Sequence, residues 1–251
     1  MTTLLMRLAG PLQSWGTQSR FKIRDTGLEP SKSGVIGLVC AALGWPRETD
    51  VTALAELRMG VRVDREGSME RDYHTVGGSH LRGERYGVVT AEGKLGGTVV
   101  SQRYYLADAD FLVGLEGDDD QLLRQIDAAL AAPVWPIFLG RKAFVPGVPV
   151  RLPDVPPRGP GLRELPLREA LATYPWFADP ARGRWGAGVK TEPKPERFRT
   201  VIETDEPFGA EVRMDQPVGA AFRDRSFTVR HVVTDFLTEV PLGGETCTSP
   251  A

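Results

Sequence analysis

An apolar strand and an apolar helix follow one another in the first 44 residues, and both have to be buried. Residues 3–8 are apolar, too few for a helix and followed by a Gly-Pro pair, so they predict a strand. Residues 31–43 predict a helix, because Ser31 or Ser33 can cap its first turn and Gly44 stands where a left-handed residue ends a helix. These two segments predict a domain that mixes helices and sheets.

The first turn of the expected helix has the composition of a phosphate site. Lys32, Ser33 and Gly34 combine a cation, free backbone N–H groups at the positive end of the helix dipole, and a residue without a side chain. A structural explanation is open as well, since serines cap helices and glycine lets a sheet approach closely. The preceding segment favours the phosphate site: residues 1–24 hold four cations and no acidic residue, which indicates a polyanionic ligand.

Composition places the chain among ordinary globular proteins. Of its 251 residues, 41% are hydrophobic and 25% charged, and no apolar run is long enough to cross a bilayer. The start of the chain lacks the pattern of a signal peptide, so we expect a cytoplasmic protein. Two cysteines and three scattered histidines match neither a disulfide framework nor metal-ligand spacing, and no metal or other cofactor is expected.

Charge is strongly segregated along the chain. Residues 107–127 hold seven acidic residues and a single arginine, whereas residues 182–199 hold six cations and two glutamates. We therefore expect one acidic and one basic face, as suits a protein between a nucleic acid and other protein subunits.

The order of the expected elements indicates an α+β fold. After the first helix, alternating or apolar segments predict strands, and residues 118–132 predict an amphipathic helix; the strands are residues 57–63, 69–76 as their hairpin partner, 99–106, 111–115 and 135–139. This is the split βαβ order of a ferredoxin-like or RNA-recognition-motif domain, assigned to residues 1–146.

The remainder is expected to form a smaller, mostly β C-terminal region at residues 147–242. Its beginning is rich in proline and glycine, as boundaries often are. A short helix at residues 165–173 and a hairpin of residues 218–222 and 227–233 are predicted there. Residues 243–251 have the composition of a disordered tail.

A glycine-rich segment at residues 77–97 separates two of the expected strands. It contains seven glycines in 21 residues, and a loop of this length inside a domain is usually functional or disordered. We expect a protruding β-hairpin, here termed a thumb, which carries Arg82 and Arg85.

One constellation allows a catalytic hypothesis. Asp72, Tyr73 and His74 stand near the glycine-rich segment, and a metal-independent ribonuclease could use His74 or Tyr73 to take the proton of a ribose 2′-OH while Lys94 steadies the phosphate. The alternative is a strand end whose polar side chains bond locally or touch RNA without catalysis. The alternative is favoured, because a single histidine without a visible partner carries little specificity.

Aromatic residues beside cations give a stronger indication. Rings stack on bases while guanidinium groups hold phosphates, which is how single-stranded RNA is usually bound. The pairs are Trp15 with Arg20, Tyr86 with Arg82 and Arg85, Tyr104 and Tyr105 with Arg103, and Trp185 with Arg184.

At this point the sequence resembles a known family, the CasD subunits of the type I-E CRISPR Cascade complex. The resemblance is carried, in the family's order, by RLAGPLQSWG at 7–16, PSKSGVIGL at 30–38, RDYHTV at 71–76, QRYYLADA at 102–109, LGRKA at 139–143 and RDRSFTVR at 223–230. The basic stretch 182–199 matches none of these blocks, and its role stays open.

The resemblance implies a function and a set of partners. It implies a non-catalytic RNA-binding subunit that caps the 5′ handle of the CRISPR RNA, with the thumb across the RNA and against the neighbouring backbone subunit. It also implies contacts with the large subunit, and with target DNA only indirectly, during antiviral DNA targeting. Relatives in type I-C systems process the precursor RNA, so an endoribonuclease acting on repeat RNA is the alternative.

Carried onto this sequence, the resemblance and the cation pattern predict no catalytic and no metal-binding residue, but a set of RNA contacts. These are Gln13, Trp15, Arg24, Lys32, Ser33, Gly34, His74, Arg82, Arg85, Arg103, Tyr104, Gly140, Arg141, Lys142, Arg223 and Arg225.

Overall fold

The computed structural model describes residues 1–16, 22–77, 87–89, 92–154, 159–176 and 193–242. They form two β-sheets with helices packed on the larger one, so the predicted α+β class is confirmed. In these residues no helix is both long and apolar enough to cross a membrane.

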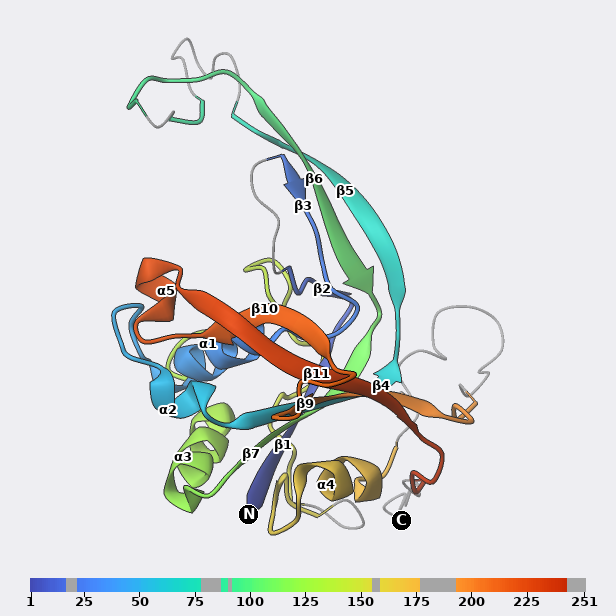
Figure 1. Cartoon of the computed structure of the whole chain (residues 1–251). Helices are drawn as coiled ribbons and strands as arrows, with labels where there is room; N and C mark the ends of the chain where they lie inside the picture. Colours follow the sequence, from blue (N-terminus) through green and yellow to red (C-terminus); the bar gives the residue numbers. More distant parts are fainter. Residues whose placement is uncertain (17–21, 78–86, 90–91, 155–158, 177–192, 243–251) are drawn as a thin grey trace, which may run out of the picture.

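The larger sheet has seven strands and is antiparallel throughout. In spatial order its strands are β10 (Glu211–Pro217), β11 (Phe227–Leu237), β9 (Phe198–Thr204), β4 (Arg58–Arg65), β7 (Asp110–Gly117), β1 (Thr2–Ala9) and β8 (Leu162–Arg163). Strands from both sides of residue 146 share this sheet (Figure 1). The division of the chain at that residue stays a prediction.

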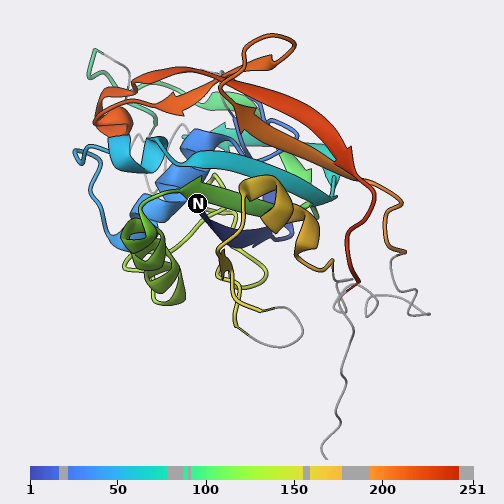
Figure 2. The ribbon, with the colours of Figure 1, turned by 60° about the horizontal axis from the view of Figure 1, so that its bottom comes forward.

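Helices cover both faces of the sheet. Because side chains alternate along β1, Leu4, Met6 and Leu8 pack beneath α1 (Lys32–Leu43) and α3 (Asp120–Ala131), whereas Leu5 packs beneath α4 (Leu167–Thr173). Figure 2 shows α4 lying across β4 and β7. The large sheet is therefore enclosed on both sides where β1, β7 and β4 meet, and this surface is not open to a ligand.

The first helix begins and ends where the sequence predicts. The Ser31 side chain accepts a hydrogen bond from the backbone N–H of Gly34, and Gly44 closes the helix with φ of 71°, the left-handed conformation that favours glycine. The predicted helix at 118–132 is likewise present as α3, and Asp119 caps it.

The second sheet forms a long hairpin that rises from the body of the molecule (Figure 1). Its strands β5 (Ser68–Val76) and β6 (Val99–Ala107) pair from Ser68–Ala107 to Val76–Val99. Two short strands flank β6: β2 (Leu12–Gln13), which is antiparallel to it, and β3 (Ile23–Arg24), which is parallel.

The hairpin corrects one predicted pairing. Residues 69–76 were expected to pair with residues 57–63, but both edges of β4 are occupied, by β7 on one side and β9 on the other. The chain turns away between the two strands at Gly67, which has φ of 73°. Strand β5 therefore enters the second sheet.

Two other predicted strands are absent. Residues 135–139 form no strand, because the N–H groups of Val134 and Trp135 donate to carbonyls of Ala42 and Ala41 at the end of α1. The edge of the sheet beside β1 is taken by β8 instead. Residues 218–222 lead into α5 (Ala221–Asp224), so the C-terminal hairpin joins β10 to β11 through a helical turn; the remaining short helix is α2 (Thr52–Ala55).

Candidate nucleic-acid interface

An open cleft of about 340 Å³ lies at the N-terminal end of α1. It is lined by segments that are distant in the sequence: Ser14, Trp15, Gly16, Arg24, Asp25, Ser31, Ser33, Gly34, Gly140, Arg141, Phe222 and Phe227. Six of the predicted RNA contacts are among them, namely Trp15, Arg24, Ser33, Gly34, Gly140 and Arg141.

Three arginines gather beside this cleft. Strand β3 places Arg24 next to Arg103 of β6, because the two residues are register partners. Burial lowers the pKa of the Arg141 guanidinium, and the positive charges of Arg103 and Arg24 lower it further, while Asp72 and Asp25 act in the opposite direction. Mutual repulsion among guanidinium groups is relieved by an anion, so the cluster is suited to phosphate.

Backbone geometry fixes the position of Arg141. The Ser14 N–H donates to the Leu139 carbonyl at 3.1 Å, and Gly140 has φ of 90°. A Cβ added at Gly140 would stand 1.8 Å from the Ser14 carbonyl oxygen, so only glycine fits. The Arg141 side chain donates to the Arg24 carbonyl at 3.3 Å and its guanidinium lies 5.5 Å from the Phe144 ring centroid. The predicted loop therefore presents its arginine to the cleft.

The structure contradicts the predicted RNA contact at Lys32. Its side chain is 1% exposed, and its ammonium donates to both carboxylate oxygens of Glu203 at 2.9 Å. Burial lowers the pKa of Lys32, although the Glu203 charge opposes that shift. The lysine stabilises the junction between α1 and the C-terminal strands and is not available to RNA in this structure.

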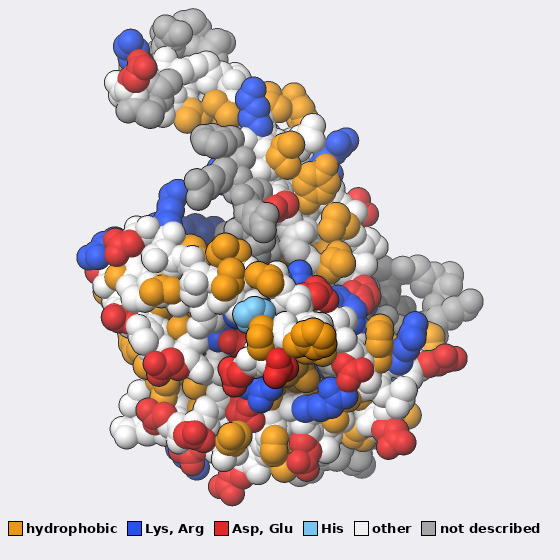
Figure 3. All heavy atoms as spheres, in the orientation of Figure 1, with side chains coloured by type: hydrophobic (Ala, Val, Ile, Leu, Met, Phe, Trp, Pro, Cys, Tyr) orange, Lys and Arg blue, Asp and Glu red, His pale blue; other side chains and the backbone are white. Residues whose placement is uncertain are grey.

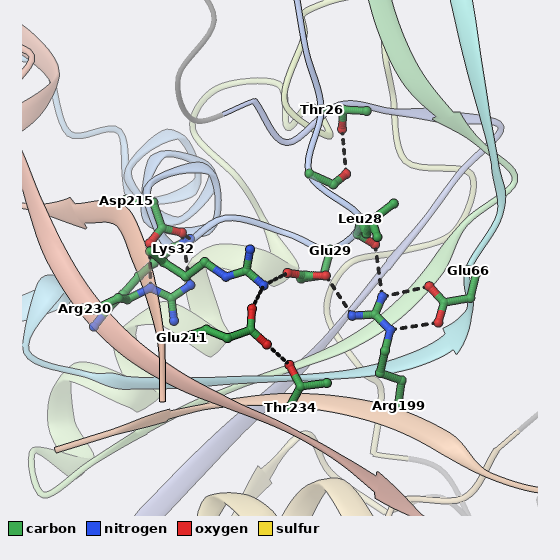
Figure 4. A network of polar contacts seen from close by, with 12 residues as sticks. Thr26, Leu28, Glu29, Lys32, Glu66, Arg199, Glu211, Asp215, Arg230 and Thr234 are labelled. Carbon is green, nitrogen blue, oxygen red and sulfur yellow. Dashed lines mark hydrogen bonds and ion pairs between the residues drawn. The ribbon is translucent and has the colours of Figure 1, made fainter. Parts of the chain in front are cut away.

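The helix N-terminus is also already occupied by an anion of the chain itself. The Asp215 carboxylate accepts from the Lys32 backbone N–H at 2.7 Å and from the Arg230 guanidinium at 2.6 and 3.0 Å. Figure 4 shows Asp215 between Arg230 and the start of α1, with a second group of ion pairs around Arg199 and Glu29. The sequence prediction of a phosphate on these backbone amides is therefore wrong for the Lys32 N–H.

Gln13 and Trp15 are buried as well. Gln13 is fully buried; its amide group donates to the Leu8 and Ala109 carbonyls and accepts from the Trp15 indole at 3.1 Å. Trp15 lines the cleft but is only 1% exposed, and it packs on α1 where a Cβ at Gly34 would lie 2.9 Å from the ring. These residues hold the cleft in shape, and Gly34 is required for that packing.

The hairpin separates two other predicted contacts. Side chains alternate along β6, so Arg103 lies on one face with its register partner Asp72, and Tyr104 lies on the other face with its partner Arg71. His74 shares the face of Asp72, and its Nδ1 lies 3.3 Å from that carboxylate. His74 therefore lies on the same face of the hairpin as Arg103, which belongs to the arginine cluster beside the cleft. Tyr104 lies on the opposite face.

Three further predicted contacts, Lys142, Arg223 and Arg225, do not line the cleft. Lys142 is exposed next to Arg141, Arg225 is exposed with φ of 54°, and Arg223 is exposed and paired with its neighbour Asp224 at 2.6 Å. Arg82 and Arg85 lie outside the described residues, as does the tail at 243–251.

Six of the cleft residues were not among the predicted contacts: Ser14, Gly16, Asp25, Ser31, Phe222 and Phe227. The two phenylalanines bracket the segment that bears Arg223 and Arg225, so they repeat the interleaving of aromatic and cationic residues that had singled out other positions. The sequence therefore contains a signal for these two rings.

Comparison with known proteins identifies the family of this chain. Residues 3–233 match the profile of a family described as CRISPR-associated protein (Cas_Cas5). The chain belongs to the Cas5 family. Residues that carry the resemblance to CasD therefore predicted the family correctly, and that prediction is confirmed.

Individual relatives support the assignment. The chain is 35% identical over 153 residues to the CRISPR system Cascade subunit CasD of Escherichia coli (strain K12), a match that covers 56% of this chain and 65% of that protein. It is similar to a solved structure titled "Crystal structure of Cas protein", with 41% identity, a TM-score of 0.70 and coverage of 96% and 98% of the two chains. It also resembles a chain of a "CRISPR RNA-guided surveillance complex", with 33% identity, a TM-score of 0.71 and coverage of 98% and 95%.

Proposed function

We propose that this Cas5 protein is a non-catalytic RNA-binding subunit of a CRISPR surveillance complex, and that it caps the 5′ handle of the CRISPR RNA. The observation that carries the proposal is the meeting of Arg24, Arg103 and Arg141 at the foot of the hairpin, beside a cleft in which Asp25 is the one carboxylate among the described lining residues. Single-stranded RNA offers the closely spaced phosphates and unstacked bases that such a site can hold. The similarity to CasD and to a chain of a surveillance complex supports the same assignment.

The topology supports the interpretation as a ferredoxin-like domain with a thumb. Strands β8, β1, β7 and β4 lie in the order expected for the split βαβ arrangement, with α1 after β1 and α3 after β7. The hairpin of β5 and β6 is inserted between β4 and β7 and extends beyond the body (Figure 1). We infer that this hairpin is the thumb, placed to lie across RNA bound at its foot.

A second surface supports the proposal of neighbouring protein subunits. Over β10 and β11 the outer face of the sheet exposes Val212, Met214, Val229 and Val233, all more than 40% exposed, and Figure 3 shows hydrophobic side chains gathered there. Phe208, in the turn before β10, is 93% exposed. Exposed hydrophobic patches of this kind mark contacts with other proteins. We infer that the backbone or large subunit of the complex covers this patch over β10 and β11.

Salt-dependent binding tests the RNA assignment. In the isolated protein, the double variant Arg141→Ala/Lys142→Ala is expected to bind 5′-handle RNA more weakly, and the slope of log Kd against log salt should fall by roughly 0.7 for each lost phosphate contact. Its midpoint of thermal unfolding should stay close to that of the parent, because Lys142 is exposed, and the loss of the 3.3 Å hydrogen bond from Arg141 to Arg24 is offset by relief of the repulsion from Arg24 and Arg103. Arg124→Ala, an exposed arginine of α3, is the matched control. Parent-like affinity of the double variant at physiological salt would remove this loop from the RNA site.

An endoribonuclease is the second candidate, because His74 lies 3.3 Å from Asp72 on the face of the hairpin that carries Arg103. In such an arrangement the carboxylate orients the imidazole, which serves as the general base, and the guanidinium binds the phosphate. Incubation with repeat RNA in EDTA decides between the candidates. Products ending in a 2′,3′-cyclic phosphate that disappear with His74→Ala would establish the enzyme, and intact RNA is expected from the non-catalytic proposal.

A further inference from the structure

We infer that the cleft at the start of α1 holds one nucleotide of the bound RNA, with its base against the Phe227 ring and its phosphate on Arg24 and Arg141. The inference deepens the proposed function and rests on it: it names a single-nucleotide subsite within the RNA site. Arg24 and Arg141 were predicted RNA contacts, whereas the structure adds the two rings, Phe222 and Phe227, to the same cleft.

The aromatic wall is built from two rings of the C-terminal region. Phe222 of α5 and Phe227 at the start of β11 both line the cleft, with ring centroids 6.4 Å apart and planes inclined at 63°. Phe222 is held from behind, because it packs against α1 where a Cβ at Gly37 would lie 3.5 Å from its ring. Phe227 is 37% exposed, so part of its surface remains accessible. A supported ring beside an accessible one is suited to stacking with a base.

The charged part of the lining lies on different segments. Arg24 comes from β3 and Arg141 from the loop after Gly140, so neither belongs to the element that carries the rings. One nucleotide joins an aromatic base to an anionic phosphate, which is the combination that these two kinds of residue bind. Asp25 adds a carboxylate acceptor to the lining, and an acceptor can bind a sugar hydroxyl or a base amino group.

The cleft is large enough for one such unit. Its volume of about 340 Å³ is at the lower end of the range of roughly 300 to 1,000 Å³ in which small-molecule ligands are bound. An RNA strand that passes the cleft can therefore insert one base while its neighbours remain outside. The subsite accordingly predicts that one position of the handle depends on Phe227 far more than the others.

Phe227→Leu tests this dependence, because leucine keeps an apolar side chain and removes only the aromatic ring. With 5′-handle RNA and the isolated protein, affinity should fall about tenfold, as expected for the loss of one stacked base, while the salt slope stays that of the parent. Phe236→Leu is the control: this residue lies on the same strand and is 43% exposed, but it does not line the cleft.

A series of RNAs with one abasic nucleotide at each handle position locates the subsite. At one position the abasic RNA should bind the parent and Phe227→Leu with equal affinity, because removal of the base already removes the stacking interaction that the variant lacks. If Phe227→Leu bound handle RNA with the affinity of the parent, or if the abasic substitution had the same effect at every position, the subsite would be overturned. The proposed function would still stand in that case, provided that the parent bound handle RNA with the expected salt dependence. Failure of the parent to bind handle RNA would overturn both.

Discussion

Replacement of Lys32 by methionine distinguishes a buried structural lysine from an RNA contact. Methionine has a similar length and no charge, so the variant leaves Glu203 without its closest cation. Truncating one partner of a buried ion pair costs about 3–5 kcal/mol, because the other charge stays buried. Glu203 keeps the Met59 N–H at 3.1 Å and the Arg230 guanidinium at 3.8 Å, and the variant no longer has to bury an ammonium group. We therefore expect a loss near the lower end, about 3 kcal/mol of unfolding free energy.

Urea and thermal unfolding at neutral pH measure this loss. For a chain of this size, 3 kcal/mol corresponds to a fall in Tm of roughly 6–12 °C. Adding Glu203→Gln removes the uncompensated charge but keeps an acceptor for the Met59 N–H, so the double variant should lose less than the sum of the two single variants. Lys142→Met, an exposed lysine, is the control and should change stability by less than about 0.5 kcal/mol.

RNA binding supplies the result that would refute the reasoning. Below its unfolding transition, Lys32→Met should bind handle RNA with the affinity and salt slope of the parent, because the ammonium group is 1% exposed. Unchanged stability together with a salt slope lower by roughly 0.7 would show instead that Lys32 reaches a phosphate, and that the pair with Glu203 opens when RNA binds.

Three shorter predictions concern the core, the cleft loop and the hairpin. Burial raises the pKa of the Cys40 thiol to about 12 from its ordinary value of 9.0. Between these two pH values the unfolded chain loses a proton that the folded chain keeps. In urea titrations the stability of the parent should therefore fall with rising pH relative to that of Cys40→Ala. Gly140→Ala should cost more than about 2 kcal/mol in the same assay, because its Cβ would stand 1.8 Å from the Ser14 carbonyl oxygen, whereas Gly93→Ala, with φ of 75° and nothing within 4 Å, should cost about 1 kcal/mol. Replacing residues 78–96 by a tight turn should leave the domain folded, since β5 and β6 pair up to Val76–Val99, but should abolish assembly around the handle in co-purification.

Local signals in the sequence were sufficient for most helices and strands. The limits of α1 follow from Ser31 and Gly44, and both caps act within a few residues of the helix. Gly140 and Arg141 were expected as contacts because they lie in the LGRKA block that carries the family resemblance. Alternation of side chains along β6 places Arg103 and Tyr104 on opposite faces of the hairpin.

Partners far apart in the chain could not be predicted in this way. Glu203 and Asp215 are 171 and 183 residues from Lys32, and nothing in the helix start reveals that two carboxylates reach it. A lysine in the first turn therefore has the same local pattern whether it is buried or exposed. Strand β5 shows the same limit, because its alternation identifies a strand but not whether β4 or β6 is its neighbour.

The C-terminal hairpin connects the stability of the fold to the chemistry of the cleft. Its Asp215 already accepts from the first turn of α1, so the proposed function assigns phosphate binding to the guanidinium groups of Arg24, Arg103 and Arg141 and not to the helix N-terminus. The same hairpin carries Phe227 into the cleft lining. Asp215→Asn would keep an acceptor for the Lys32 N–H and remove the charge that pairs with Arg230, so we expect it to destabilise the junction between this hairpin and the start of α1.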